Sequence, residues 1–358
     1  MRFSNWCHAR ILVLAVSLLL AASGRSYAQT GNLSNRGKEF WVGYGHHQFM
    51  ELGQTNAQDM VLYFSAEQTA NVRVIVKGRT LIWDSVYSVP AGTVLASRPL
   101  PKGQNTPTNN YGASVVGLDC RLFDYPPSFG GIGSENIFNR SIHIISDVPI
   151  VAYAHIFGSF SSGATMLLPI ESWGYSYTSI NSYQVDAAGP GYSWCYVVAK
   201  EDNTKIEITP SVTTLTGNPA NVPFTKTINK GEIYQFVAPS DASGNGPQLT
   251  GSRIKSIDNG TGNCYPIAVF SGSSRTRGEI ACGTGSGRDN DMQQCFPTQT
   301  WGKLYLTAPF STANSATAIN ASVFMTSVYK IAVKEAGTVV KRNGVVLTGA
   351  VNGIYQFT

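Results

Sequence analysis

Trp173-Gly174-Tyr175-Ser176-Tyr177 is one of three similar stretches that divide the chain into units. Phe40-Trp41-Val42-Gly43-Tyr44 precedes it, and Trp301-Gly302-Lys303-Leu304-Tyr305 follows it. The three tryptophans are 132 and 128 residues apart. Repetition of a whole supersecondary unit is typical of modular proteins, in which each unit packs mainly against its neighbours. Because the tryptophans open each unit, we interpret them as structural core residues, in preference to a platform for sugars: Trp41, Trp173 and Trp301.

Later parts of the units also repeat. Gly231–Phe236 reads Gly-Glu-Ile-Tyr-Gln-Phe and is echoed by Gly353–Phe357. A proline followed by an apolar strand closes the first two units, with Pro149 in one and Pro266 in the other. We interpret both prolines as structural.

The third unit is short, because 58 residues run from Trp301 to the last residue, whereas each earlier unit takes about 130. We therefore expect a truncated chain, continued beyond Thr358 by further modules or completed by a partner strand. The expected organisation is a signal peptide over 1–28, a first β module over 29–170, a second over 171–298 and an incomplete third over 299–358.

Residues 1–28 have the pattern of a secretory signal peptide. Arg2 and Arg10 provide the positive start, a nearly uninterrupted apolar run of 12 residues begins at Ile11, and Ala28 ends a small-residue cleavage site. The run is too short to cross a bilayer core of about 30 Å as a helix, and no later stretch is apolar enough. The sequence predicts a secreted, extracellular or cell-surface protein without a membrane span.

The charge composition argues against a nucleic-acid partner. Without residues 1–28 the chain has 23 basic and 21 acidic residues, and it contains no run of Lys or Arg. Charged residues make up 13% of the sequence, against about 25% in typical domains. Polar, uncharged surfaces of this kind suit extracellular β-rich proteins.

Five cysteines follow the signal peptide, and an exported protein is expected to oxidise those that lie close together. The pair that we expect is Cys264 with Cys282, which flank an apolar strand and a Gly/Ser loop. Cys195 with Cys295 or with Cys120 stays open. No Cys-x-x-Cys or Cys/His spacing predicts a zinc site.

The apolar pattern is that of strands almost throughout. Residues 72–77, 205–209 and 252–257 alternate apolar with polar side chains, as half-buried antiparallel strands do. Pro149–Phe157 and Pro266–Phe270 are continuous apolar runs, which we interpret as central strands buried on both faces. With turn signals throughout and no amphipathic helix, the sequence predicts an all-β fold of tandem antiparallel β-sandwich-like modules with long Gly/Pro loops. A β-propeller is the alternative, but its blades are about 40–50 residues long.

Two long loops are the predicted recognition surfaces, because loops on a rigid scaffold commonly carry function. They are Arg98–Gly133 and Gly272–Asn290, and tyrosines are the expected contact residues. The alternative is an inert insertion, which suits the first loop as well as recognition does and the second loop less well.

No stretch carries a recognisable catalytic or metal motif. His46-His47 with Glu51 is the most enzyme-like group, but adjacent histidines on a strand point to opposite faces. Asp289 and Asp291 with Asn290, or Asp202 with Asn203, could bind calcium, although the EF-hand spacing is absent. We predict no catalytic, cofactor-binding or metal residues and no cofactor, with calcium left open.

The order of short blocks in the last two units resembles the IgGFc-binding protein N-terminal domain family. Pro149–His155, Ser161–Pro169 and Trp173–Tyr177 are followed by Pro266–Gly272, Arg288–Pro297 and Trp301–Tyr305. The resemblance extends over Gly37–Thr358. It implies an extracellular, non-catalytic adhesive region, in a bacterial surface protein rather than an animal mucin-like one. It licenses no transfer of immunoglobulin binding, because no residue motif carries that activity.

Three hypotheses follow. The first is a non-catalytic adhesion or recognition protein that binds an extracellular protein or glycan. The second is a structural spacer within a larger surface protein. The third is a glycan-processing enzyme with its site between modules, for which Glu39, Glu51 and Glu171 are the carboxylates to test.

Overall fold

The computed structural model describes residues 34–47, 59–102, 116–124, 133–158, 161–185, 191–276, 289–308, 311–315, 318–324 and 328–358. The predicted signal peptide lies outside these residues, as do Glu51, Cys282 and large parts of both predicted recognition loops. Within the described residues no helix is both long enough and apolar enough to cross a membrane.

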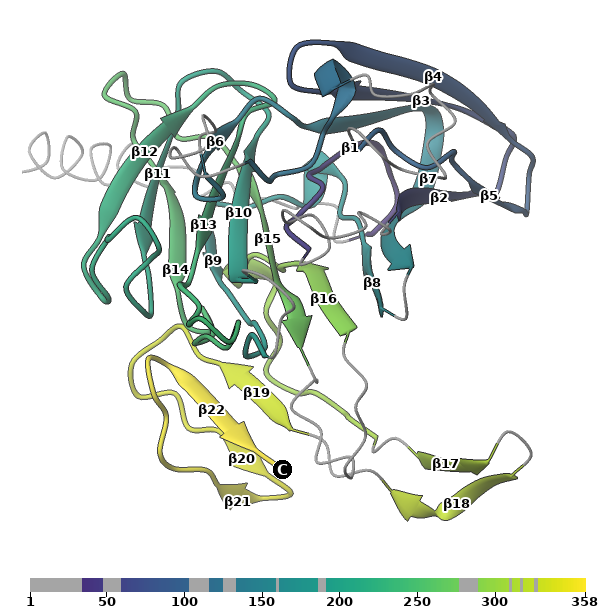
Figure 1. Cartoon of the computed structure of the whole chain (residues 1–358). Coiled ribbons are helices and arrows are strands. Elements are labelled where there is room, and N and C mark those ends of the chain that lie inside the picture. Colours follow the sequence, from purple (N-terminus) through teal and green to yellow (C-terminus); the bar gives the residue numbers. More distant parts are fainter. Residues whose placement is uncertain are drawn as a thin grey trace, which may run out of the picture. The chain divides into compact units, whose positions relative to one another are not determined.

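The first sheet has seven antiparallel strands (Figure 1). They are β1 (Gly37–Val42), β2 (Asp59–Ala66), β3 (Ala70–Lys77), β4 (Ile82–Val89), β5 (Val94–Ala96), β7 (Ile142–Gly158) and β8 (Ser161–Met166). The first part of β7 pairs with β1 and β3, and its second part pairs with β2 and β8. The predicted alternation over 72–77 is confirmed, because Val72, Val74 and Val76 are buried while Arg73 is exposed.

A second sheet contains β6 (Asn136–Phe138), β10 (Ser193–Ala199), β13 (Ile233–Val237), β15 (Ile267–Thr276) and β16 (Asp289–Gln294) in the order β16-β15-β10-β13-β6. Every residue of β10 is buried, because both faces of this sheet are covered. Trp194 and Tyr196 belong to a first core shared with the seven-stranded sheet, while Cys195 and Val197 belong to a second core on the other face.

The third sheet covers that second core. It contains β9 (Ser176–Thr178), β11 (Thr204–Thr209), β12 (Phe224–Ile228) and β14 (Arg253–Ile257) in the order β12-β11-β14-β9, and it contributes Ile206, Ile208 and Ile254. The predicted all-β, sandwich-like fold is confirmed. The first core draws on both sides of residue 170, for example Phe40 and Trp194, while the predicted module boundaries stay predictions.

The two runs predicted to be buried on both faces differ in their burial. Ile267–Phe270 at the start of β15 is buried on both faces, as predicted. Pro149–Phe157 is not: within β7 buried and more exposed residues alternate, and Tyr153 is exposed on the outer face. The prediction for this run was wrong because aromatic and β-branched side chains here form an outward surface as well as a core.

The C-terminal region is built of short strands. Three two-stranded sheets pair β17 (Ser311–Ser315) with β18 (Ala318–Phe324), β19 (Tyr329–Ala332) with β22 (Ile354–Phe357), and β20 (Lys341–Arg342) with β21 (Val345–Val346). The two similar glycine-led sequences also have the same backbone conformation at their glycines. Gly231 precedes β13 and Gly353 precedes β22, and each has a φ of 76°. A positive φ of this size favours glycine.

The second and third units share one local structure around their tryptophans. A short 3-10 turn, η4 (Ile170–Ser172) or η5 (Thr298–Thr300), starts after Pro169 or Pro297 and ends at Trp173 or Trp301. The indole Nε1 donates a 3.1 Å hydrogen bond to the carbonyl of Leu168 in one unit and of Phe296 in the other. Trp41 differs, since it lies within β1, bonds Glu39 and stacks on His143 at 3.7 Å.

Candidate recognition surface

The outer face of the first sheet bears a cluster of aromatic side chains on β2 and the second part of β7. Every second residue of β7 points outward there, which places Tyr153, His155 and Phe157 in one row along the strand. Tyr63 of β2 lies directly opposite Tyr153, and Val61 lies opposite His155. Since directly opposite residues share a face of a sheet, these side chains form one surface.

The paired residues of strands β8 and β5 extend this surface with uncharged side chains. At its end Asp59 of β2 lies opposite Phe157, but this carboxylate is buried and forms an ion pair with Lys102. On β8, Met166, Ala164 and Ser162 lie opposite Tyr153, His155 and Phe157. On β5, Ala96 and Val94 lie opposite Tyr63 and Ser65 of β2. We call this set the uncharged face: Val61, Tyr63, Ser65, Val94, Ala96, Val151, Tyr153, His155, Phe157, Ser162, Ala164 and Met166.

The rings of the uncharged face are held at defined distances. His155 and Phe157 are stacked with 4.8 Å between ring centroids, and Tyr63 lies 6.0 Å from His155. His155 Nε2 is 2.8 Å from Ser162 Oγ. Burial lowers the pKa of His155 below its ordinary value, which favours the neutral imidazole.

The other part of the same sheet is different. Arg73 of β3 and Asp84 of β4 form an ion pair on its outer side, and Glu39 bonds His143 at 2.9 Å. Val86 of β4 lies directly opposite Arg73 and is exposed. One sheet thus carries a charged outer half and an uncharged, aromatic outer half.

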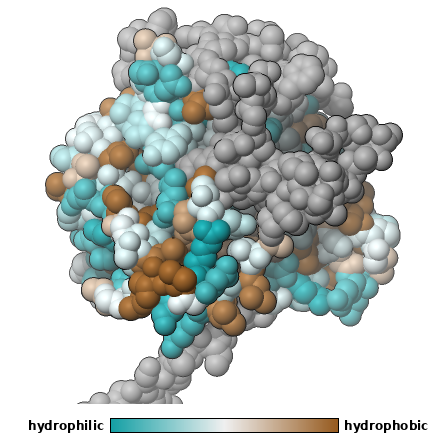
Figure 2. All heavy atoms as spheres, turned by 90° about the horizontal axis from the view of Figure 1, so that it is seen from below, coloured by the Kyte–Doolittle hydropathy of each residue, from teal (hydrophilic) through white to brown (hydrophobic). Residues whose placement is uncertain are grey.

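A surface of this composition suits recognition. Tyrosine and phenylalanine rings bury a large apolar area against a partner, and tyrosine keeps a polar hydroxyl for hydrogen bonding. Exposed apolar residues also occur elsewhere, and Figure 2 shows one face of the molecule on which hydrophobic residues gather among hydrophilic ones. The uncharged face differs in having four aromatic rings on adjacent, paired strands of a rigid sheet.

One described segment of the first predicted recognition loop is largely buried. Within residues 116–124, the side chains of Asp119, Cys120, Arg121 and Leu122 are almost inaccessible to solvent. Gln235 of β13 donates a 2.7 Å hydrogen bond to the Leu122 carbonyl, which fixes this segment to the second sheet. Residues 103–115 and 125–132 of the same loop lie outside the described residues.

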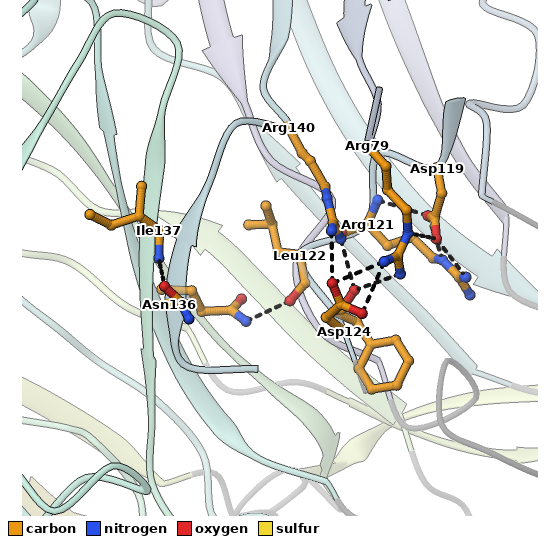
Figure 3. Close-up of polar contacts among 10 residues, drawn as sticks. Arg79, Asp119, Arg121, Leu122, Asp124, Asn136, Ile137 and Arg140 are labelled. Carbon is orange, nitrogen blue, oxygen red and sulfur yellow. Dashed lines mark hydrogen bonds and ion pairs between the residues drawn. The ribbon is translucent and has the colours of Figure 1, made fainter. Parts of the chain in front are cut away.

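Buried ion pairs hold the 116–124 segment in place (Figure 3). Arg79 contacts Asp124 at 2.9 Å and Asp119 at 3.4 Å, while Arg140 reaches Asp124 at 3.0 Å. Burial alone would raise the pKa of Asp119, but the Arg121 guanidinium holds it below its ordinary value. Because each charge has an opposite partner, we interpret the cluster as a structural anchor.

His46 and His47 are both 1% exposed and contact serine hydroxyls. His46 Nδ1 contacts Ser274 Oγ, and His47 Nε2 lies 3.2 Å from Ser161 Oγ. Their predicted companion Glu51 is outside the described residues. Nowhere in the described part of the chain do three or more His, Cys, Asp or Glu side chains gather as metal ligands.

Two of the carboxylates that were considered for calcium accept hydrogen bonds from the protein backbone. Asp289 accepts a hydrogen bond from the Ser162 backbone, and Asp202 accepts one from the Lys230 backbone, each at 2.9 Å. Asp291 instead lines a polar cavity of about 270 Å³. There Lys330 of β19 donates to the Asn181 carbonyl at 2.6 Å, which joins the C-terminal region to the second unit.

Cys195 forms a disulfide with neither Cys295 nor Cys120. Cys195 of β10 lies opposite Ser271 of β15, and Cys295 bonds Val269 on the other side of that strand. With β15 between them, their backbones are about 10 Å apart, beyond the roughly 7 Å that a disulfide spans. Cys120 belongs to the first core and Cys195 to the second, which separates that pair as well. Cys264 is exposed, and its pairing with Cys282 stays a prediction because Cys282 lies outside the described residues.

The predicted structural residues occupy different environments. Trp41 and Trp173 belong to the first core, whereas Trp301 is half-buried. Pro149 is an exposed residue within β7, and Pro266 immediately precedes β15. The aromatic members of the uncharged face were missed, because the run around Tyr153 was expected to be buried on both sides. The spacing of Tyr153, His155 and Phe157 at every second position was the available signal.

The comparison with protein families gives one match. The family model described as IgGFc binding protein matches residues 163–356, which is more than half of the chain. No curated protein and no solved structure matches the sequence. The matched range begins at the end of the uncharged face and includes both Trp-Gly motifs of the later units. The chain belongs to the IgGFc binding protein family.

Proposed function

We propose that the protein is a secreted, non-catalytic recognition protein of a bacterial cell surface, which binds an extracellular protein or glycan through the uncharged face. The observation that carries the proposal is the row of Tyr153, His155 and Phe157, with Tyr63 alongside, on a rigid antiparallel sheet. Family membership supports binding as the class of function.

The chemistry of the uncharged face favours a partner that brings little charge. A charged group placed against it would lose water without gaining an opposite charge, which is costly. Ring faces pack against apolar surfaces such as the C–H face of a sugar or an aliphatic side chain, while the hydroxyls of Tyr63, Tyr153 and Ser162 add hydrogen bonds.

A binding panel tests this function. The purified chain is presented with immunoglobulin G Fc, a secreted mucin and an array of neutral and acidic glycans, and bound protein is measured by surface plasmon resonance. Saturable binding to a neutral glycan or to a protein at micromolar concentration is expected, with no change in the ligand when it is recovered and analysed by mass spectrometry.

Two outcomes contradict the proposal. Failure to bind any member of the panel would favour a structural spacer that presents other domains. Recovery of a cleaved glycan would favour an enzyme, and substitution of Glu39 or Glu171 by glutamine would then identify the responsible carboxylate.

A further inference from the structure

The Trp-Gly-x-x-Tyr motif is buried in the second unit and exposed in the third, although its internal hydrogen bonds are the same. The backbone N–H of Gly174 donates to the Tyr177 hydroxyl at 2.8 Å, and that of Gly302 donates to the Tyr305 hydroxyl at 2.8 Å. Tyr177 is 2% exposed and Tyr305 is 64% exposed. One preformed structure is therefore covered in one place and open in the other.

In the second unit the motif is covered by the proline–isoleucine strand that begins β15. The backbone N–H of Ile267 donates to the Gly174 carbonyl at 2.9 Å, which makes an antiparallel bridge between these residues. The Tyr177 hydroxyl donates to the Ile267 carbonyl at 2.6 Å. The motif thus offers one acceptor and one donor that match both backbone groups of a single strand residue.

The glycine of the motif allows a second contact. A Cβ atom at Gly174 would lie 1.9 Å from Gln299 Nε2 and 2.5 Å from Pro297 Cβ, so the turn that opens the third unit packs directly on this glycine. Gly37 has the same relation to the earlier turn, since its Cβ would lie 2.2 Å from Pro169 Cβ. Each proline-led turn therefore packs on a glycine of the preceding unit.

In the third unit no described residue makes either contact. The nearest atoms to a Cβ at Gly302 are those of Tyr305 at 3.7 Å, within its own motif. Among the described residues, the Tyr305 hydroxyl donates to no acceptor like the Ile267 carbonyl. Leu304 and Leu306, on either side of it, are more than four-fifths exposed.

We propose that Gly302 and Tyr305 form a docking site for a proline–isoleucine strand of another repeat unit. In this interaction the incoming isoleucine donates its N–H to the Gly302 carbonyl and accepts a hydrogen bond from the Tyr305 hydroxyl, as Ile267 does with Gly174 and Tyr177. The occupant is assigned by the equivalent contact within the same chain, and the proposal does not depend on the uncharged face. Stacking of units through one repeated interface is the organisation of repeat proteins.

A peptide of the strand tests the site. A fluorescent peptide with the sequence of Tyr265–Gly272 is added to the full chain, and its anisotropy is measured against protein concentration. Saturable binding is expected, and it is expected to weaken about tenfold in Tyr305→Phe, which loses one hydrogen-bond donor. Gly302→Ala is expected to leave both peptide binding and the unfolding midpoint nearly unchanged, because the equivalent Gly174 contacts the proline-led turn and not the strand, and the added methyl would make only ordinary van der Waals contact with Tyr305.

Matched controls distinguish binding at this site from nonspecific binding. Tyr183→Phe changes another exposed tyrosine and is expected to bind the peptide like the unchanged protein. A peptide with aspartate in place of the isoleucine is expected not to bind. Absence of saturable binding up to about 1 mM, or equal binding by Tyr305→Phe and the unchanged protein, would overturn the proposal.

Discussion

His47 is the residue whose ionisation departs most from its ordinary behaviour among the described histidines with a resolved shift. Burial, with a smaller contribution from His46, lowers its pKa from 6.5 to about 3. The neutral ring lies beside the Ser161 hydroxyl, which in turn donates to the Asn290 side chain at 3.1 Å. This links β8 and β16 at one end of the uncharged face.

The pKa of His47 predicts a loss of stability in acid. Above pH 6.5 the residue is neutral in the folded and the unfolded chain, so it contributes no pH dependence. Between pH 6.5 and about 3 the unfolded chain binds a proton that the folded chain excludes, which lowers the free energy of unfolding by up to about 1.4 kcal/mol per pH unit. Urea unfolding of the unchanged protein and of His47→Gln at pH 7, 6 and 5 measures this slope.

The His47→Gln variant is expected to show a shallower fall in stability between pH 7 and pH 5, whatever its stability at pH 7. Equal slopes in the two proteins would show that His47 is not the group that is protonated. Sequence reasoning singled out His46-His47 as the most enzyme-like group but did not predict that both rings are buried. Burial of both rings depends on contacts with Ser161 and Ser274, which are more than 100 residues away in sequence.

At the level of single elements, alternation in sequence predicted strands well and predicted their surroundings less well. The stretches around Val74, Ile206 and Ile254 all form strands with apolar residues inward. Pro149–Phe157 and Pro266–Phe270 read alike, yet only the second is buried on both faces. The difference arises because β15 lies in the second sheet, between two cores, whereas β7 lies in an outer sheet.

Gly174 is the glycine whose substitution tests the contact between units. In Gly174→Ala the new methyl would overlap Pro297, a rigid residue, as well as the movable Gln299 side chain. Overpacking of this kind is expected to lower the free energy of unfolding by about 1–3 kcal/mol. Chemical denaturation with Gly302→Ala as the matched control measures the effect.

Gly302→Ala places the same substitution in the same motif where, among the described residues, the added methyl would make only ordinary van der Waals contacts with Leu304 and Tyr305, so its effect is expected to be within about 0.5 kcal/mol. If the two variants lost equal stability, the close approach of the 3-10 turn to Gly174 would not be what requires glycine there. The repeat itself was predictable from the tryptophan spacing, but the contact was not, because only the fold brings Pro297 to Gly174.

At the level of the whole molecule, three antiparallel sheets share two cores, and the second sheet contributes to both. The all-β class followed from composition and alternation. The stacking of sheets did not, because β6 from the first predicted module pairs with β13 of the second, a contact across about 100 residues that no local pattern encodes. The full extent of the uncharged face was not predicted either, because it is assembled from the four strands β5, β2, β7 and β8.

The measurement that most directly tests the central claim compares two variants that place an aspartate on opposite halves of one sheet. Binding to the strongest ligand of the panel is measured for the unchanged protein, Tyr153→Asp and Val86→Asp, with circular dichroism to confirm that both variants fold. Tyr153→Asp is expected to weaken binding by about thirtyfold or more, the effect of losing a central aromatic contact. Val86→Asp, on the charged half, is expected to bind within about twofold of the unchanged protein, as substitutions away from an interface do. If the loss occurred in Val86→Asp, and Tyr153→Asp bound normally, recognition would not take place on the uncharged face.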